Sequence, residues 1–159
     1  MSANRLHARD ALIAGCLIAA IASIPGVAQG KGAVNADKHG VAIKGYDPVA
    51  YFSQGKAVHG QPQRSHAWGG ATWHFATDEN RRAFVENPER YAPQYGGYCA
   101  WAVSQGHTAP IDPSAWRIVN GKLYLNYDKK IRAKWEKNRD ALIGRADSNW
   151  PGIRTRLKP

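Results

Sequence analysis

Cysteine and methionine are nearly absent from this chain of 159 residues. The cysteines are Cys16 and Cys99, and the one methionine is Met1. Cys16 falls in an N-terminal segment that we expect to be removed, which leaves Cys99 as the single thiol. One thiol excludes an intramolecular disulfide and any tetrahedral metal site built from several cysteines. The domain must therefore be stabilised by packing, chiefly of its aromatic side chains.

The chain also lacks a hydrophobic run long enough to span a bilayer. The uncharged and mostly apolar stretch Ala11–Ile24 has fourteen residues, whereas a membrane helix needs about 20. Arg5 and Arg9 precede this stretch, and Pro25–Ala28 follows it with a helix breaker and small residues. Residues 1–28 are therefore predicted to be a signal peptide, and the mature protein is expected in the periplasm or outside the cell.

A lipid anchor is the alternative for this N-terminal segment. Ile13-Ala14-Gly15-Cys16 resembles a bacterial lipobox, which would make Cys16 the lipidated first residue. Asp10 leaves only a short apolar stretch before Cys16, so a removed signal peptide is the favoured reading.

Acidic residues are few compared with basic ones. The chain has 22 Lys and Arg against 12 Asp and Glu, a net charge of +10. A basic surface can steer a protein toward an acidic envelope protein or an anionic lipid surface. It can equally be a solvated face without a partner. Nucleic acid is not expected as the partner of an exported protein, and the composition leaves the oligomeric state open.

Common catalytic motifs are missing as well. The sequence contains no Gly-x-Ser-x-Gly elbow, His-Glu-x-x-His pair, Walker loop or Gly-x-Gly-x-x-Gly fingerprint. Asp47 and Asp112 are each followed by proline, which is typical of a helix cap or turn rather than of a catalytic pair. The sequence therefore predicts that the protein is not an enzyme.

The patterns that are present predict one α+β domain over residues 40–153, made of short β-hairpins and helices. Gly69-Gly70 and Asn120-Gly121 are the turns of two expected hairpins. Residues 29–39 are expected to be a flexible lead-in and residues 154–159 a basic tail. A C-terminal amphipathic helix is expected from residue 128 to Pro151-Gly152, with an apolar face of Ile131, Trp135, Leu142, Ala146 and Trp150.

Two segments read Asp-Pro-x-Ala-aromatic, one starting at Asp47 and the other at Asp112. They could be traces of a duplicated unit. Because no period recurs elsewhere in the chain, two independent proline-capped turns are the favoured interpretation.

The stretch Tyr91–Trp101 combines four aromatic residues, the glycine pair Gly96-Gly97 and Cys99. A short helix from Tyr98 to Gln105, capped by Gly106, would place Cys99 in its first turn. A helix N-terminus favours the thiolate form of cysteine. The alternative is that Cys99 is a small buried hydrophobic residue of the core.

The chain resembles the YHS-domain family over residues 40–150. The resemblance is carried by Gly45-Tyr46-Asp47-Pro48-Val49-Ala50-Tyr51-Phe52, Trp73-His74-Phe75, Asn87-Pro88-Glu89-Arg90-Tyr91 and Tyr95-Gly96-Gly97-Tyr98-Cys99-Ala100. YHS domains occur beside metal transporters and metal-dependent oxygenases, so the resemblance implies metal handling in the cell envelope. Metal-binding relatives have cysteines where this chain has Ala50 and Ala76.

A small exported YHS-type binding module that holds a metal ion is therefore the leading functional hypothesis. Copper suits a single thiolate best, with zinc or iron as alternatives. Cys99 is the predicted metal ligand, completed by His74 or His107. The residues expected to line the site are Tyr95, Gly96, Gly97, Tyr98, Tyr46 and Asp47.

Two further hypotheses stay open at this point. In the first, the protein is a metal-free interaction domain that docks on a protein or a membrane surface through the basic residues between Lys129 and Arg139. In the second, Cys99 performs thiol redox chemistry through mixed disulfides.

Overall fold

The computed structural model describes residues 33–157, so the predicted signal peptide and the lipid anchor at Cys16 lie outside the described residues. It confirms the α+β class. The elements are, in order, η1 (Ile43–Gly45), α1 (Ala50–Ser53), β1 (Gln61–Trp68), β2 (Ala71–Phe75), α2 (Asp78–Glu86), α3 (Pro88–Tyr91), η2 (Gln94–Gly97), α4 (Ala100–Ser104), β3 (Asp112–Val119), β4 (Lys122–Asn126), α5 (Lys129–Glu136) and α6 (Arg139–Arg156). Among residues 33–157, no helix is both long and apolar enough to cross a bilayer.

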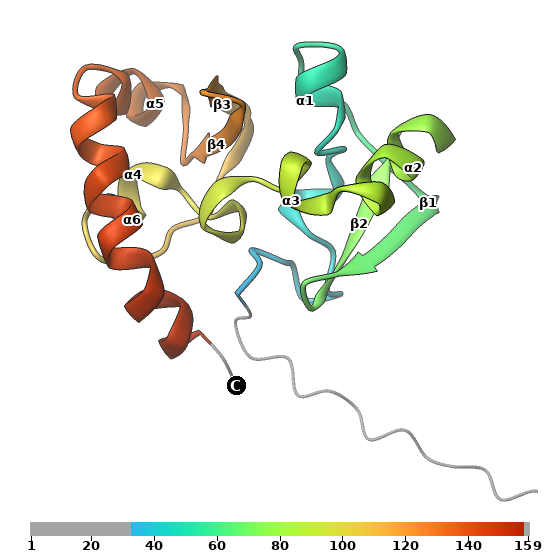
Figure 1. Cartoon of the computed structure of the whole chain (residues 1–159), viewed down its shortest axis with the longest axis horizontal. Helices are drawn as coiled ribbons and strands as arrows, with labels where there is room; N and C mark the ends of the chain where they lie inside the picture. The colour runs from blue at the N-terminus through green and yellow to red at the C-terminus, as the bar shows by residue number, and fades with distance from the viewer. Residues whose placement is uncertain (1–32, 158–159) are drawn as a thin grey trace, which may run out of the picture.

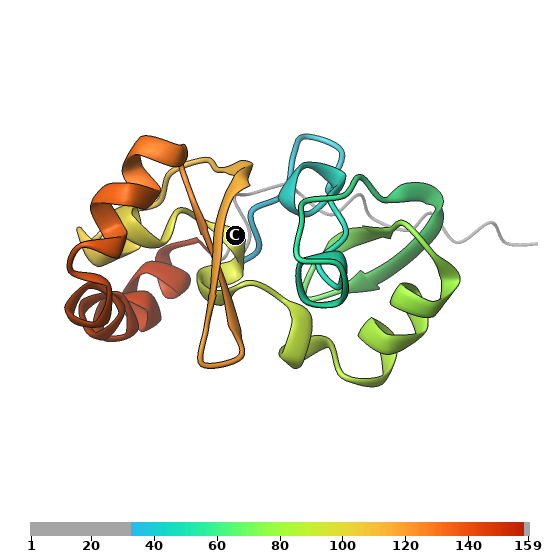
Figure 2. The same cartoon turned by 90° about the horizontal axis from the view of Figure 1, so that it is seen from above.

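One structural unit occurs twice in the described chain. The first unit, residues 43–86, runs through a 3-10 turn, a short helix, a β-hairpin and a second helix: η1, α1, β1–β2 and α2. The second unit, residues 94–136, repeats this order with η2, α4, β3–β4 and α5. The two units lie side by side in both views, with α3 on the connection between them (Figures 1 and 2).

The hairpins of the two units have the same register. In each hairpin, four consecutive residue pairs lie next to the turn, and an irregularity separates them from a fifth pair farther out. Residues at equivalent positions in the two hairpins are 51 apart in the sequence, as Gln61 and Asp112 are. The 3-10 turns match as well, because three consecutive residues with positive φ end at Gly45 in one unit and at Gly97 in the other. The described chain therefore contains a repeated unit, although no period was found in the sequence. Asp47 and Asp112 are not equivalent positions in this repeat, so the two Asp-Pro-x-Ala-aromatic segments are independent of each other, as the favoured interpretation held.

Local sequence explains the hairpins. The turn residues Gly69, Gly70, Asn120 and Gly121 all have positive φ, as expected for tight hairpin turns. Alternation along β2 buries Trp73 and Phe75 and leaves Thr72 and His74 partly exposed. His74 therefore lies on the more exposed face of this strand.

The core has two parts. The larger cluster joins both units, because residues of the first unit such as Trp73 and Phe84 pack in one cluster with Leu123 and Leu125 of β4. The second cluster lies between the second unit and α6 and contains Trp135 and Leu142. Burial of these large side chains is the main favourable contribution to folding.

The predicted single C-terminal helix is two helices. The chain breaks at Lys137–Asn138, between α5 and α6. Pro151 does not end α6 but lies inside it, and the helix continues to Arg156, so the first residues of the expected basic tail are helical. Packing of Leu142, Ala146 and Ile153 in the core keeps α6 in place despite the proline.

The described part of the expected flexible lead-in is packed against the fold. Val34 is buried. The backbone N–H of Asn35 donates to Gly96 O at 2.8 Å, and its side-chain amide donates to Gly97 O at 3.0 Å. Residues 33–39 are therefore an ordered part of the domain, joined to the turn η2.

Candidate functional site

Cys99 is the N-cap residue of α4, one position before the helix, and its side chain is fully buried. Burial is the main influence on its thiol and raises the pKa. The backbone N–H groups of Ala102, Tyr127 and Trp101 donate toward the sulfur and act in the opposite direction, but the net shift is upward. Cys99 is therefore a protonated thiol at neutral pH, and the expectation of a helix-stabilised thiolate was wrong.

Asn126 is the polar neighbour of this thiol. The distance between Cys99 Sγ and Asn126 Oδ1 is 3.9 Å, and Oδ1 also accepts the N–H of Trp101 at 3.3 Å. The Nδ2 group of Asn126 is buried and has no hydrogen-bond partner among the described residues. The thiol thus lies in a sealed environment with one side-chain amide beside it.

The predicted ligand histidines are not assembled around Cys99. His74 is a partly exposed residue of β2 in the first unit, whereas Cys99 is a fully buried residue of the second unit. His107 follows α4 and is exposed. No group of three or more His, Cys, Asp or Glu side chains that could hold a metal occurs within residues 33–157. A bound metal stays a prediction without an assembled set of ligands.

Asp47 was expected to line a binding site, but it is a fully buried structural residue. One carboxylate oxygen accepts the N–H groups of Val49 at 2.8 Å and Ala50 at 3.2 Å. The other accepts the N–H of Ala76 at 2.8 Å and the amide of Asn80 at 2.7 Å. These four hydrogen bonds tie α1, the end of β2 and α2 together, which offsets the cost of burying the charge.

The other predicted lining residues also have structural roles. Tyr46 packs on His59, with ring centroids 4.0 Å apart. Tyr95 is buried and donates to Asp147 Oδ1 at 2.8 Å, and burial together with this hydrogen bond raises its pKa. Gly97 and Tyr98 are buried. Of the predicted set, Gly96 alone lines the cleft described next.

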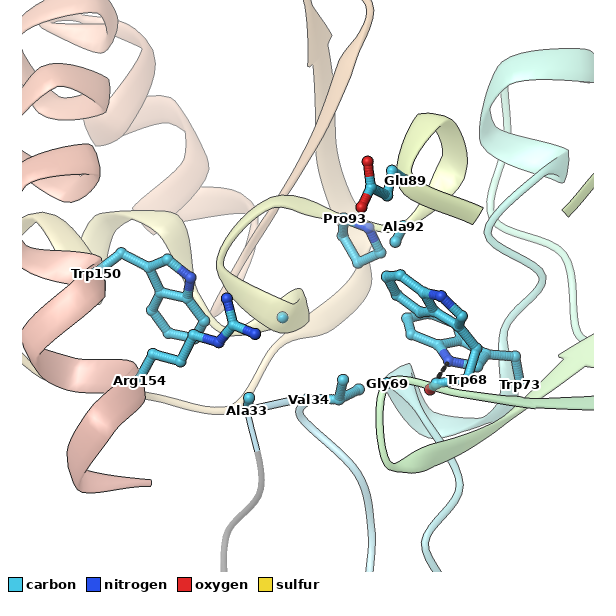
Figure 3. A pocket seen from close by; sticks show the side chains of 11 residues that line it. Ala33, Val34, Trp68, Gly69, Trp73, Glu89, Ala92, Pro93, Trp150 and Arg154 are labelled. Atoms are coloured by element: carbon cyan, nitrogen blue, oxygen red, sulfur yellow. Dashed lines mark hydrogen bonds between the residues drawn. The ribbon is translucent and has the colours of Figure 1, made fainter. Parts of the chain in front are cut away.

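A cleft of about 240 Å³ opens between the first unit and α6, the helix that follows the second unit. We call it the inter-unit cleft. Figure 3 shows Trp68 and Trp73 of the first hairpin on one side and Trp150 and Arg154 of α6 on the other. The remaining lining residues that the structure describes are Ala33, Val34, Gly69, Glu89, Ala92, Pro93 and Gly96.

Three indole rings dominate the walls of this cleft. Trp73 is almost fully buried, and its indole N–H donates to Trp68 O at 3.0 Å, which holds it in one orientation. The Trp68 and Trp73 rings are 6.1 Å apart between centroids. Trp150 is half-buried and packs on Tyr95 with a centroid distance of 6.0 Å. The walls are therefore apolar, aromatic and fixed by packing.

Two opposite charges accompany these rings. Glu89 lies on α3 and Arg154 on α6, and both side chains are exposed. Neither forms an ion pair with another residue in the described chain. A carboxylate and a guanidinium without protein partners are thus both available to a molecule in the inter-unit cleft.

Sequence reasoning missed this cleft because its residues are far apart in the chain. Trp150 was assigned to the apolar face of a helix, and Trp68 to a hairpin, with no reason to bring them together. The one available signal was the high tryptophan content, six residues in the chain. Tryptophan is rarely so frequent without a binding or packing role.

Searches for related proteins gave no match: no family model, no curated protein and no solved structure matches the chain. The resemblance to YHS domains therefore stays a prediction from the motifs alone, and the site has to be interpreted from its own chemistry.

Proposed function

We propose that this protein is a non-catalytic binding module of the cell envelope that holds a small organic ligand in the inter-unit cleft. The observation that carries the proposal is the composition of the cleft: two indole rings from the first unit and one from α6, with one unpaired carboxylate and one unpaired guanidinium. Small-molecule sites in proteins are typically concave, mostly apolar or aromatic, and supplied with a few polar groups that orient the ligand.

The position of the cleft also supports binding. It lies where the first unit, the connection through α3 and α6 meet, and ligand sites occur preferentially at such junctions. Its walls come from β1, β2 and α6, while its floor is formed by Ala33 and Val34, which are hydrogen-bonded to the rest of the fold through Asn35. The site is therefore formed before a ligand binds, which reduces the entropy lost on binding.

The described lining offers binding groups rather than a reactive set. It contains no serine, cysteine or histidine, and Glu89 is its single carboxylate. Cys99, the residue on which the metal and redox hypotheses depend, is buried in the core and is not among the described lining residues. We therefore favour neither of them and propose a metal-free module that binds a small ligand, which differs from the metal-free domain that docks on a protein or membrane surface.

A cleft-filling variant tests the proposal. The side chain of Ala33 is half-buried and belongs to neither core cluster, so Ala33→Phe should fill the inter-unit cleft and keep the fold. Val85→Phe adds the same ring at an exposed position on α2 and serves as the matched control. A set of fragment-sized soluble compounds would be measured against all three proteins by ligand-observed NMR.

We expect fragments that bind the wild-type protein and Val85→Phe equally and that lose binding to Ala33→Phe. The same fragments should quench or shift the tryptophan fluorescence, because three of the six tryptophans line the cleft. If no fragment distinguishes Ala33→Phe from the wild-type protein, while circular dichroism shows both folded, the inter-unit cleft is not a binding site.

A further inference from the structure

We infer that the ligand of the inter-unit cleft is a compact zwitterion, a small molecule that carries a positively charged amine, preferably quaternary, and a carboxylate. This inference rests on the proposed function and adds the chemical class of the ligand. It follows from the three kinds of group that the lining presents: aromatic faces, one carboxylate and one guanidinium.

The aromatic rings select for the cationic end. A quaternary ammonium group is attracted to the negative face of an indole, and tryptophan provides the strongest attraction of the aromatic side chains. The cleft offers the partly exposed rings of Trp68 and Trp150. Trp73 is almost fully buried and packs beside Trp68, so it holds that ring in place rather than contacting a ligand.

Glu89 adds a formal negative charge to this preference. Glu89 lies on α3, and Figure 3 shows it next to Pro93 and Ala92 at the edge of the cleft. A methylated ammonium group is weakly hydrated and loses little when it leaves water for an aromatic surface with a nearby carboxylate. A neutral apolar molecule would gain the ring contacts but nothing from Glu89.

Arg154 accounts for the anionic end. Its guanidinium projects from α6 toward the centre of the cleft in Figure 3. A planar guanidinium binds a carboxylate through two parallel hydrogen bonds, which gives direction as well as attraction. Because Glu89 and Arg154 come from different elements and are not paired with each other, one small molecule with both charges satisfies both.

Three probes separate these contributions. Glycine betaine carries both charges, 3,3-dimethylbutanoate replaces the quaternary nitrogen by carbon and keeps the carboxylate, and choline keeps the cation but has a hydroxyl in place of the carboxylate. Dissociation constants would be measured by calorimetry with the wild-type protein. We expect betaine to bind about tenfold more tightly than either single-charge probe.

Charge variants assign each end of the ligand. Glu89→Gln should weaken betaine and choline by about tenfold and leave 3,3-dimethylbutanoate unchanged, and Arg154→Gln should weaken betaine and 3,3-dimethylbutanoate but not choline. Matched controls are Glu86→Gln on α2 and Arg156→Gln at the end of α6, both exposed and outside the described lining. These controls should leave all three affinities unchanged.

The outcomes distinguish this inference from the proposed function. If betaine and 3,3-dimethylbutanoate bind equally, or if the control variants have the same effect as Glu89→Gln and Arg154→Gln, the zwitterion inference is wrong. Fragments that Ala33→Phe excludes would then still support the binding module, with a neutral or singly charged ligand. If Ala33→Phe excludes nothing, the proposed function fails first.

Discussion

Asp47 and Cys99 occupy equivalent positions in the two copies of the repeated unit. Each side chain faces the backbone N–H groups of the second and third residues after it and of the residue that follows the second hairpin strand. These donors are Val49, Ala50 and Ala76 in the first unit and Trp101, Ala102 and Tyr127 in the second. The fold therefore creates one acceptor position twice, filled by a carboxylate in one unit and by a thiol in the other.

This equivalence predicts which residues position 99 accepts. Cys99→Val removes the acceptor and leaves buried N–H groups unsatisfied, each at a cost of about 1–3 kcal/mol. Cys99→Asp keeps an acceptor of similar size for these N–H groups. We expect Cys99→Asp to be more stable than Cys99→Val by about 1–2 kcal/mol in urea unfolding at pH 7. Equal stability of the two variants would show that the donors do not need an acceptor.

Asp47→Asn should destabilise the first unit strongly. The substitution replaces the carboxylate oxygen that accepts from Ala76 and Asn80 by an amide that donates, so donors face donors. We expect a loss of about 3 kcal/mol in the free energy of unfolding. Asp112→Asn is the matched control, because Asp112 also precedes a proline but is partly exposed and accepts from Ser114 alone. The control should lose less than about 1 kcal/mol, and a similar loss in both variants would contradict the assignment.

Gly96 should tolerate no side chain. Its φ of +61° is unfavourable for other residues, and a Cβ there would overlap the carbonyl oxygen of Ala33. Gly121→Ala is the control, since Gly121 also has positive φ but faces open space. We expect a loss of about 1 kcal/mol for Gly121→Ala from backbone strain alone.

Gly96→Ala should lower the free energy of unfolding by more than twice as much as Gly121→Ala does. It should also displace residues 33–35, which include the floor of the inter-unit cleft. Thermal unfolding and the amide NMR signal of Asn35, which donates to Gly96 O, would report both effects. An unchanged Asn35 signal would mean that the N-terminal segment adapts to the methyl group.

The thiol of Cys99 should be unreactive in the native protein. Burial raises its pKa above the ordinary value of 9.0, so a thiol reagent at pH 8 should modify it only at the rate of unfolding. Because the pKa of the thiol is higher in the folded than in the unfolded state, the protonated thiol contributes its full share to the free energy of unfolding below about pH 9. This contribution is lost as the pH rises through the folded-state pKa. Cys99→Ser should lack this part of the alkaline loss. Rapid labelling of the native thiol would overturn the assignment and revive the redox hypothesis.

The sequence by itself was sufficient for the local structure. Turn residues such as Asn120-Gly121, which the structure confirms, act within a few positions of the chain, as do the capping residues Thr77 and Asn87. The alternation along β2 likewise determines which face His74 occupies. Short-range hydrogen bonding and side-chain periodicity determine these features, so they can be read without knowledge of the fold.

Tertiary structure decided everything that depends on distant residues. Cys99 has the same local sequence signals whether it is exposed or sealed, and only the packing of β4 with Asn126 against it settles its chemistry. The duplication was hard to see in the sequence because many equivalent positions share burial rather than identity, as Phe84 and Trp135 do. The inter-unit cleft joins Trp68 to Trp150, residues 82 positions apart. Contacts across such separations arise from the docking of whole units, which no local pattern encodes.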